Sequence, residues 1–181
     1  MAGGRAVGIS GKDGGLIQAR KLMAVSKANQ HADRGAIDLG YVGEPERVDT
    51  SVIDALNAAR LIPVIAPVGV GAAGETFNIN ADTSAGAIAA ALGATRMLML
   101  TDVAGVLDKS GKLITELTVS EAEALIRDGT VSGGMIPKVE TCINAVLGGA
   151  EAAVIMDGRA PHALLVELFT EHGMGTFIKA G

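Results

Sequence analysis

The sequence contains few of the residues that build disulfides, metal centres and aromatic binding surfaces. Its 181 residues include one cysteine, three histidines, one tyrosine, three phenylalanines and no tryptophan. The lone Cys142 excludes a disulfide framework and a cysteine-based metal site. The histidines (His31, His162 and His172) share no metal-ligand spacing, so no metal site is predicted. The net charge of -5 and the shortage of aromatic rings exclude a nucleic-acid surface, which needs clustered basic and stacking side chains.

Long apolar runs are missing as well. No stretch reaches the ~18 to 20 apolar residues that a membrane-spanning helix requires. The first residues contain no apolar signal segment either. We therefore expect a cytoplasmic protein that has no membrane and no nucleic-acid partner.

Small and aliphatic residues dominate what is present. The hydrophobic fraction is 49%, only 2% of the residues are aromatic, and 25 are glycine. This composition predicts a core of Ala, Val, Ile, Leu and Met, in which small residues let helices pack closely on a sheet. The length fits one domain over residues 1–181, with a hairpin or loop excursion at residues 11–48.

Hydrophobic periodicity predicts strands that alternate with helices. The expected strands cover residues 5–10, 16–22, 37–43, 61–66, 75–79, 96–100, 103–107, 152–156 and 176–178. The expected helices cover residues 51–60, 118–128, 137–147 and 162–170, with a further Ala-rich helix from a cap at Asn80 or Asp82 to about residue 92, and a polar loop covers residues 27–35. This alternation indicates a mainly parallel sheet with helices on both faces, which is a three-layer α/β fold.

Two glycine-containing segments resemble phosphate-binding motifs but do not satisfy them. Residues 69–74 match G-x-G-x-x-G, yet the residues that follow alternate like a strand, whereas the dinucleotide fingerprint requires a helix there. A hairpin tip is the favoured interpretation. Gly11-Lys12 fails as a P-loop, because Ala6 stands at the first glycine position and Asp13 replaces the Ser or Thr that holds magnesium.

Three polar side chains flank the expected join between a strand and the Ala-rich helix: Asn78, Asn80 and Asp82. In a parallel sheet, ligands gather at the carboxyl ends of strands and the amino ends of the following helices. The apolar composition of this helix indicates burial, and its N-terminal dipole then favours an anionic ligand. An equally open alternative is that Asn80 and Asp82 are ordinary helix caps.

Two further segments have candidate chemistry. Lys138 lies in the first turn of an expected helix, where the dipole disfavours a cation, and Gly133 and Gly134 would let backbone approach a ligand. The alternative is an ordinary surface lysine. Residues 98–107 follow a buried strand with Thr101 and Asp102, and they could form a slot for a flat apolar group such as adenine. A plain strand–turn–strand is the alternative there.

These segments together resemble the amino-acid kinase family, and within it the acetylglutamate kinases. The matching text is found at residues 8–14, 38–43, 78–82, 100–107, 133–139, 157–159 and 173–176. The resemblance covers essentially the whole chain in order. It implies phosphoryl transfer from ATP, with Mg2+ carried by the nucleotide, to the side-chain carboxylate of N-acetyl-L-glutamate in arginine biosynthesis. A carboxylate acceptor ordinarily has a pKa of about 4.3 and needs no general base, so the enzyme must supply positioning and positive charge.

The resemblance also implies roles for individual residues. Asn78, together with Asn80, holds the acetylglutamate, Lys138 stabilises charge on the transferring phosphoryl group, and Asp82 orients the catalytic lysines. The residues that frame the nucleotide are Asp102, Val103, Ala104, Gly105, Val106, Leu107, Thr130, Val131, Ser132 and Met135.

The chain departs from the family pattern in two respects. The family's glycine-rich segment, first catalytic lysine and substrate-clamping arginine precede the position of Arg5, so we expect the C-terminal, nucleotide-binding portion, which binds ATP but turns over weakly or not at all. The full-length protein is expected to be a homo-oligomer. Glu167 and Gly173 match the tail that binds the inhibitor arginine, but Val154 stands where arginine-inhibited relatives have a histidine. A sister kinase for another carboxylate, carbamate or nucleotide acceptor, and a nucleotide-binding module without catalysis, are the alternatives.

Overall fold

The computed structural model describes residues 3–25, 36–170 and 173–181. It divides into two compact units, Met1–Ser84 and Ala85–Gly181. The polar loop predicted at residues 27–35 lies outside the described residues, as do His31 and His172. Within the described ranges, no helix has both the length and the apolar character to cross a membrane.

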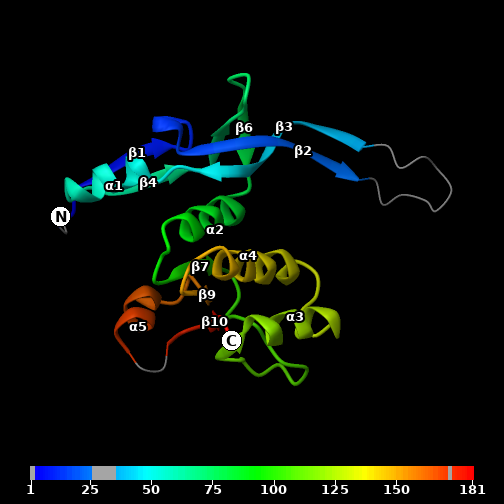
Figure 1. The fold of residues 1–181 in the computed structure, drawn as a ribbon. Helices are drawn as coiled ribbons and strands as arrows, with labels where there is room; N and C mark the ends of the chain where they lie inside the picture. The colour runs from blue at the N-terminus through cyan, green and yellow to red at the C-terminus, as the bar shows by residue number, and fades with distance from the viewer. Residues whose placement is uncertain (1–2, 26–35, 171–172) are drawn as a thin grey trace. The chain divides into compact units, whose positions relative to one another are not determined.

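A parallel pair of strands opens the first unit. Strand β1 (Ala6–Ser10) pairs with β4 (Ile62–Ala66) in the register Ala6↔Ile62 to Ser10↔Ala66. The short 3-10 helix η1 (Asp13–Gly15) follows β1, and helix α1 (Ser51–Ala58) lies beside the pair (Figure 1). Ile53 is the buried residue of α1. The predicted strand–helix–strand order of this region is confirmed.

The other strands of this unit close a small barrel in the order β2-β3-β6-β5. Strands β2 (Ile17–Val25) and β3 (Ala36–Val48) form a long antiparallel hairpin, and β5 (Val68–Val70) pairs antiparallel with β6 (Thr76–Ile79) (Figure 1). The glycines at residues 69–74 therefore join two antiparallel strands, with Gly71 N–H donating to Glu75 C=O at 2.9 Å. The hairpin-tip interpretation is confirmed, because no helix begins at these glycines.

Helix α2 (Ala81–Ala91) follows β6, and the second unit is built on one sheet in the order β7-β9-β10-β8. Its remaining elements are β7 (Met97–Thr101), β8 (Glu116–Thr118), α3 (Val119–Arg127), α4 (Met135–Leu147), β9 (Ala152–Asp157), α5 (Ala163–Phe169) and β10 (Thr176–Lys179). Strand β9 is parallel to β7 and antiparallel to β10, whereas β10 is parallel to β8.

Strand β9 lies at the centre of the core, and helices cover both of its faces. Ala153 and Ile155 pack in one cluster with residues of α3 and α4, whereas Val154 and Met156 pack on the other side with Ala163 of α5. A strand buried on both faces explains the uninterrupted apolar run in the sequence. The α/β fold with helices on both faces is thereby confirmed.

The structure differs from the prediction at several places, and one of them is strand β5 at Val68–Val70, which was not predicted. Residues 103–107 form a loop instead of a strand, with one isolated bridge between Leu107 and Leu113. Strand β8 was not predicted, because its three residues include a charged side chain and no alternating pattern. Helix α4 begins at Met135, two residues before the expected start, and its first turn tolerates Pro137, which has no N–H to lose there.

Candidate functional site

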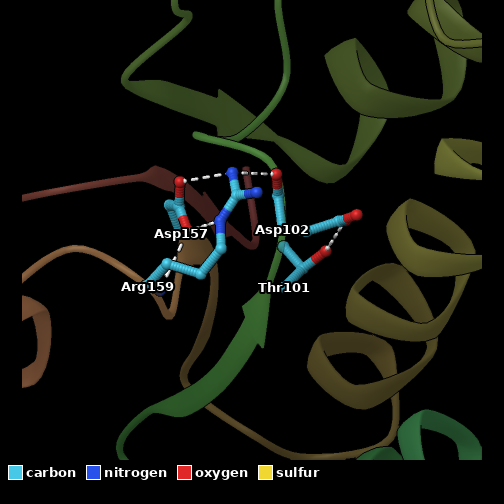
Figure 2. A network of polar contacts seen from close by, with 4 residues as sticks. All are labelled: Thr101, Asp102, Asp157 and Arg159. Carbon is cyan, nitrogen blue, oxygen red and sulfur yellow. Dashed lines mark hydrogen bonds and ion pairs between the residues drawn. The ribbon is translucent and has the colours of Figure 1, made fainter.

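The carboxyl ends of β7 and β9 meet at one edge of the sheet in the second unit. The two strands are parallel, with Thr101 in register with Asp157. Just beyond them, the Arg159 guanidinium donates to both carboxylate oxygens of Asp157, from Nε at 3.0 Å and from Nη2 at 2.9 Å. Nη2 also donates to the main-chain oxygen of Asp102 at 2.6 Å, so that Arg159 bridges the ends of the two strands (Figure 2).

This ion pair remains charged at neutral pH. The hydrogen bond from Arg159 holds the pKa of the Asp157 carboxyl below its ordinary value, and Asp157 in turn raises the pKa of Arg159. Because the Arg159 side chain is 69% exposed, the pair adds little to stability by itself. The geometry of the pair is more important. The bidentate contact with Asp157 orients the guanidinium so that Nη2 reaches the Asp102 carbonyl.

The loop that follows Asp102 is fixed at its other end by Thr176. Thr176 is fully buried, and its hydroxyl accepts from Val106 N–H at 2.8 Å while donating to Ile114 C=O at 2.6 Å. Gly105 has a φ of +144°, and a Cβ there would stand 2.6 Å from the Thr176 hydroxyl. Only glycine fits at this point, so the path of the loop is set by close backbone packing.

A cavity of about 160 Å³ lies against this loop. Its lining residues are Val103, Gly105, Val106, Leu107, Thr130, Val131, Ser132 and Met135. The structure thus brings together every residue predicted to frame a nucleotide except Asp102 and Ala104, which are exposed beside it. Apolar walls with a few polar groups suit a flat, largely apolar ligand.

The far wall of the cavity is fixed by Asp128 at the end of α3. Its carboxylate accepts from Thr130 N–H at 2.9 Å and pairs with Lys109 Nζ at 3.2 Å. The Thr130 hydroxyl, the Thr130 N–H and Lys109 together lower the pKa of Asp128 to about 2. The Thr130 oxygen itself is buried, so this residue lines the cavity while its hydroxyl faces the protein interior.

Helix α4 begins beside the cavity. Met135 lines the cavity, and Lys138 is half-buried one turn further along the helix. A Cβ added at Gly133 or Gly134 would meet no atom within 4 Å. The space beside these glycines fits the prediction that a ligand can approach the backbone here.

The three polar residues of the strand-to-helix join belong to the first unit. Asn78 is exposed on β6 between its partners Val42 and Val68. Asn80 Oδ1 accepts from Thr83 N–H at 3.1 Å, so Asn80 acts as the cap of α2. Asp82 is half-buried in the first turn of that helix. The capping alternative is confirmed for Asn80, whose side-chain NH₂ is still able to donate to a ligand.

Comparison with known proteins gives the family of this chain. The model of the amino acid kinase family matches residues 1–157. The chain belongs to the amino acid kinase family. Among its relatives, the acetylglutamate kinase of Acidiphilium cryptum is 67% identical over 99% of this chain and 60% of that protein. The acetylglutamate kinase of Gluconobacter oxydans is 64% identical over 99% of this chain and 61% of that protein. The chain thus spans about 60% of the length of these relatives.

Solved structures with a similar fold are known. N-acetylglutamate synthase from Neisseria gonorrhoeae, complexed with coenzyme A and N-acetyl-glutamate, is 25% identical with a TM-score of 0.84, covering 99% of this chain and 38% of that one. Carbamate kinase from Giardia lamblia bound to AMP-PNP is 22% identical with a TM-score of 0.61, covering 90% of this chain and 52% of that one. The second likeness concerns the fold alone.

A second cavity contains the two residues that match the family's effector tail. It has a volume of about 280 Å³, and its lining includes Glu167, Gly173, Arg96 and Phe177. Glu167 is 6% exposed and accepts from Met174 N–H at 2.8 Å, while Arg96 Nη1 lies 3.5 Å from its carboxylate. The Arg96 guanidinium also stacks over the Phe177 ring at 5.3 Å. Val154, the position at which a histidine is expected in arginine-inhibited relatives, is buried on β9 in the cluster with Met156 and Ala163 and does not line this cavity.

Sequence reasoning gave no role to Arg159, Thr176 or Arg96. Asp157-Gly158-Arg159 and Thr176 lie in segments that contributed to the family resemblance. The sequence did contain a signal for this ion pair. Asp157 and Arg159 are two residues apart and follow directly on a fully apolar run. Over the described part of the chain, no group of three or more His, Cys, Asp or Glu residues is placed to hold a metal ion.

Proposed function

We propose that this chain is the nucleotide-binding part of an acetylglutamate kinase, which transfers a phosphoryl group from ATP to the side-chain carboxylate of N-acetyl-L-glutamate. The observation that supports this most directly is the cavity at residues 103–107 and 130–135, which gathers residues that the family resemblance predicts around a nucleotide. Identities of 57% to 67% with proteins named acetylglutamate kinase favour this acceptor, and with it a role in arginine biosynthesis.

In this proposal the adenine ring lies in the cavity beside residues 102–107. Val106, Leu107 and Met135 supply apolar contact in this cavity. The phosphates then extend toward the start of α4, where helical N–H groups and Lys138 favour negative charge. Mg2+ would arrive with the nucleotide and neutralise the phosphate oxygens.

The residues of the first unit serve the acceptor. Asn78, with the side-chain NH₂ of Asn80, would bind N-acetyl-L-glutamate, and Asp82 would orient the catalytic lysines. Because the acceptor carboxylate is already an anion at neutral pH, none of these groups needs to remove a proton. Lys138 would stabilise the charge that develops on the transferring phosphoryl group.

Two measurements on the chain test this proposal. Calorimetry should show ATP binding by the chain as it stands. ADP production dependent on N-acetyl-L-glutamate should be slow or absent, because the chain spans about 60% of the relatives' length and the family resemblance implies a first catalytic lysine and a substrate-clamping arginine outside that span. The Acidiphilium cryptum relative is the positive control for turnover. Near-normal turnover by this chain alone, or no ATP binding at all, would contradict the proposal.

Two alternatives give different outcomes in the same assays. A sister kinase would produce ADP with aspartate, carbamate or a nucleotide acceptor and show no preference for N-acetyl-L-glutamate. A nucleotide-binding module would bind ATP without any acceptor effect, even when the portion of a relative that this chain does not match is supplied on a second polypeptide. The homo-oligomeric state and the cytoplasmic location expected from the sequence remain predictions.

We further propose the cavity around Glu167 and Gly173 as an effector site for a cationic amino acid such as arginine. A buried carboxylate with one main-chain donor is the chemistry that recognises a guanidinium. Arg96 already lies against that carboxylate, so a free ligand would have to displace it. This competition predicts weak binding of arginine.

A further inference from the structure

We propose that Arg159 is a positioning residue for the nucleotide cavity. It acts through the main-chain oxygen of Asp102 and fixes the point at which the cavity loop leaves β7. The proposal rests on the function proposed above, in which this cavity binds the adenine end of ATP.

The anchor of this contact is rigid. Asp157 is the last residue of β9, whose preceding residues are buried on both faces. Both of its carboxylate oxygens accept from Arg159, so the plane of the guanidinium is fixed relative to the strand. Gly158 adds to this by donating its N–H to Thr101 C=O at 2.9 Å, which holds the turn tightly against β7.

The loop that follows β7 is anchored on both sides of the stretch that lines the cavity. Arg159 holds the Asp102 carbonyl at 2.6 Å, and Thr176 holds the Val106 N–H at 2.8 Å. Only three residues separate these anchors, and two of them, Val103 and Gly105, line the cavity. A displacement of the Asp102 carbonyl therefore moves the wall that faces the adenine ring.

A direct contact between Arg159 and the nucleotide phosphates would be a different role. The two roles are separable, because a wall defect weakens every ligand that contains adenine, whereas a lost phosphate contact weakens only the phosphorylated ones. ATP and adenosine are therefore the two probes. Arg159 is mostly exposed, so its replacement leaves the core unchanged.

The test compares Arg159→Gln, Arg159→Lys and Asp157→Asn with the control Arg127→Gln. Arg127 is a matched control because it is 67% exposed, its guanidinium pairs with Glu123 at 3.4 Å on α3, and it is not one of the residues that line the cavity. The dissociation constants of ATP and of adenosine are measured by calorimetry, and the urea midpoint of each variant is measured in parallel. The double variant of Arg159→Gln with Asp157→Asn completes a thermodynamic cycle.

We expect Arg159→Gln to weaken ATP and adenosine equally, by about tenfold, which corresponds to the loss of one charge-assisted hydrogen bond. Arg159→Lys should not restore affinity, because one ammonium cannot hold the Asp157 fork and the Asp102 carbonyl together. The double variant should be no weaker than either single variant, and the urea midpoints should match that of Arg127→Gln.

Several results would overturn the inference while leaving the proposed function standing. These are equal affinities in Arg159→Gln and Arg127→Gln, a loss confined to ATP, or additive effects of the Arg159 and Asp157 changes. A drop in the urea midpoint of Arg159→Gln and Asp157→Asn below that of the control would also overturn it, as a general loss of stability. Failure of the unchanged protein to bind either probe would overturn the proposed function itself and this inference with it.

Discussion

At the scale of single residues, Thr176 holds the cavity loop in place through one hydroxyl. That hydroxyl accepts from Val106 N–H and donates to Ile114 C=O, in a site with no solvent exposure. Two separate segments of backbone are thereby satisfied by one buried oxygen. Buried main-chain groups without such partners cost more free energy than the hydrogen bond itself contributes.

Replacement of Thr176 by valine tests this role. The shape is retained, but the Val106 N–H and the Ile114 carbonyl lose their partner. The free energy of unfolding should fall by about 1 to 3 kcal/mol. Urea unfolding measures this loss, and Thr176→Ser, which keeps the hydroxyl, should recover most of it. A valine variant as stable as the unchanged protein would mean that these groups find other partners.

Lys138 gives a second prediction at this scale, one that separates phosphate contacts from contacts with the base. Lys138→Ala removes a cation from the first turn of α4, where we place the phosphates. ATP should bind on the order of tenfold more weakly, while adenosine should bind unchanged. Calorimetry with both ligands provides the comparison, and Lys112→Ala, an exposed lysine of the 108–112 turn, serves as the control. Equal losses for ATP and adenosine would place Lys138 away from the phosphates.

The element scale shows why some of this architecture could be predicted and some could not. Strand β9 and helix α3 follow from local patterns: β9 is a continuous apolar run, and α3 begins with a capping box between Thr118 and Glu121. Residues 103–107 are equally apolar, and local pattern alone predicts a strand. In the structure they form a loop, in which the Val106 N–H donates to the hydroxyl of Thr176, 70 residues away in sequence, instead of to a neighbouring strand.

The candidate site divides in the same way. The nucleotide-framing residues came from a family resemblance over two short segments, and the structure places most of them around one cavity. The Arg159 contact could not be predicted, because Asp102 is 57 residues away and contributes only its main-chain oxygen. Any residue type at position 102 offers that oxygen, so the sequence carries no trace of the contact.

The prediction at the scale of elements concerns the cavity that is lined by Glu167 of α5 and Phe177 of β10. Arg96→Ala should let free arginine reach the Glu167 carboxylate, which has lost its internal guanidinium. Thermal unfolding is the measurement. Arginine at millimolar concentration should raise the melting temperature of Arg96→Ala, and leave those of the unchanged protein and of Arg127→Ala as they are. Citrulline, whose side chain carries no charge, should have no effect on any of them. An equal response of the unchanged protein would show that Arg96 does not compete for this carboxylate.

On the scale of the whole molecule, a common electrostatic feature recurs in both units. Seven carboxylates of the described residues have a pKa below the ordinary value, and each is lowered first by a hydrogen bond from a nearby backbone or side chain. They are Asp13, Asp38, Asp49, Asp108, Glu121, Asp128 and Asp157. Most accept from a residue two or three positions away, so they fix turns and helix ends instead of joining distant elements.

These carboxylates make the stability of the protein depend on acidity in a defined range. A group whose pKa is lower in the folded than in the unfolded state stabilises the fold above its unfolded value, and this stabilisation is lost as the pH falls toward the folded value. For Asp128 the range runs from the ordinary 3.8 down to about 2. The urea midpoint should therefore be level near neutral pH and decline progressively below about pH 4.

In Asp128→Asn the decline should be shallower between pH 3.8 and about pH 2, because the variant has no proton to bind at this position. Glu140→Gln, which removes an exposed carboxylate from α4, should follow the unchanged protein. A decline that is equally steep in Asp128→Asn would assign the acid sensitivity to the other six carboxylates and would remove Asp128 from the account of how the far wall of the cavity is held.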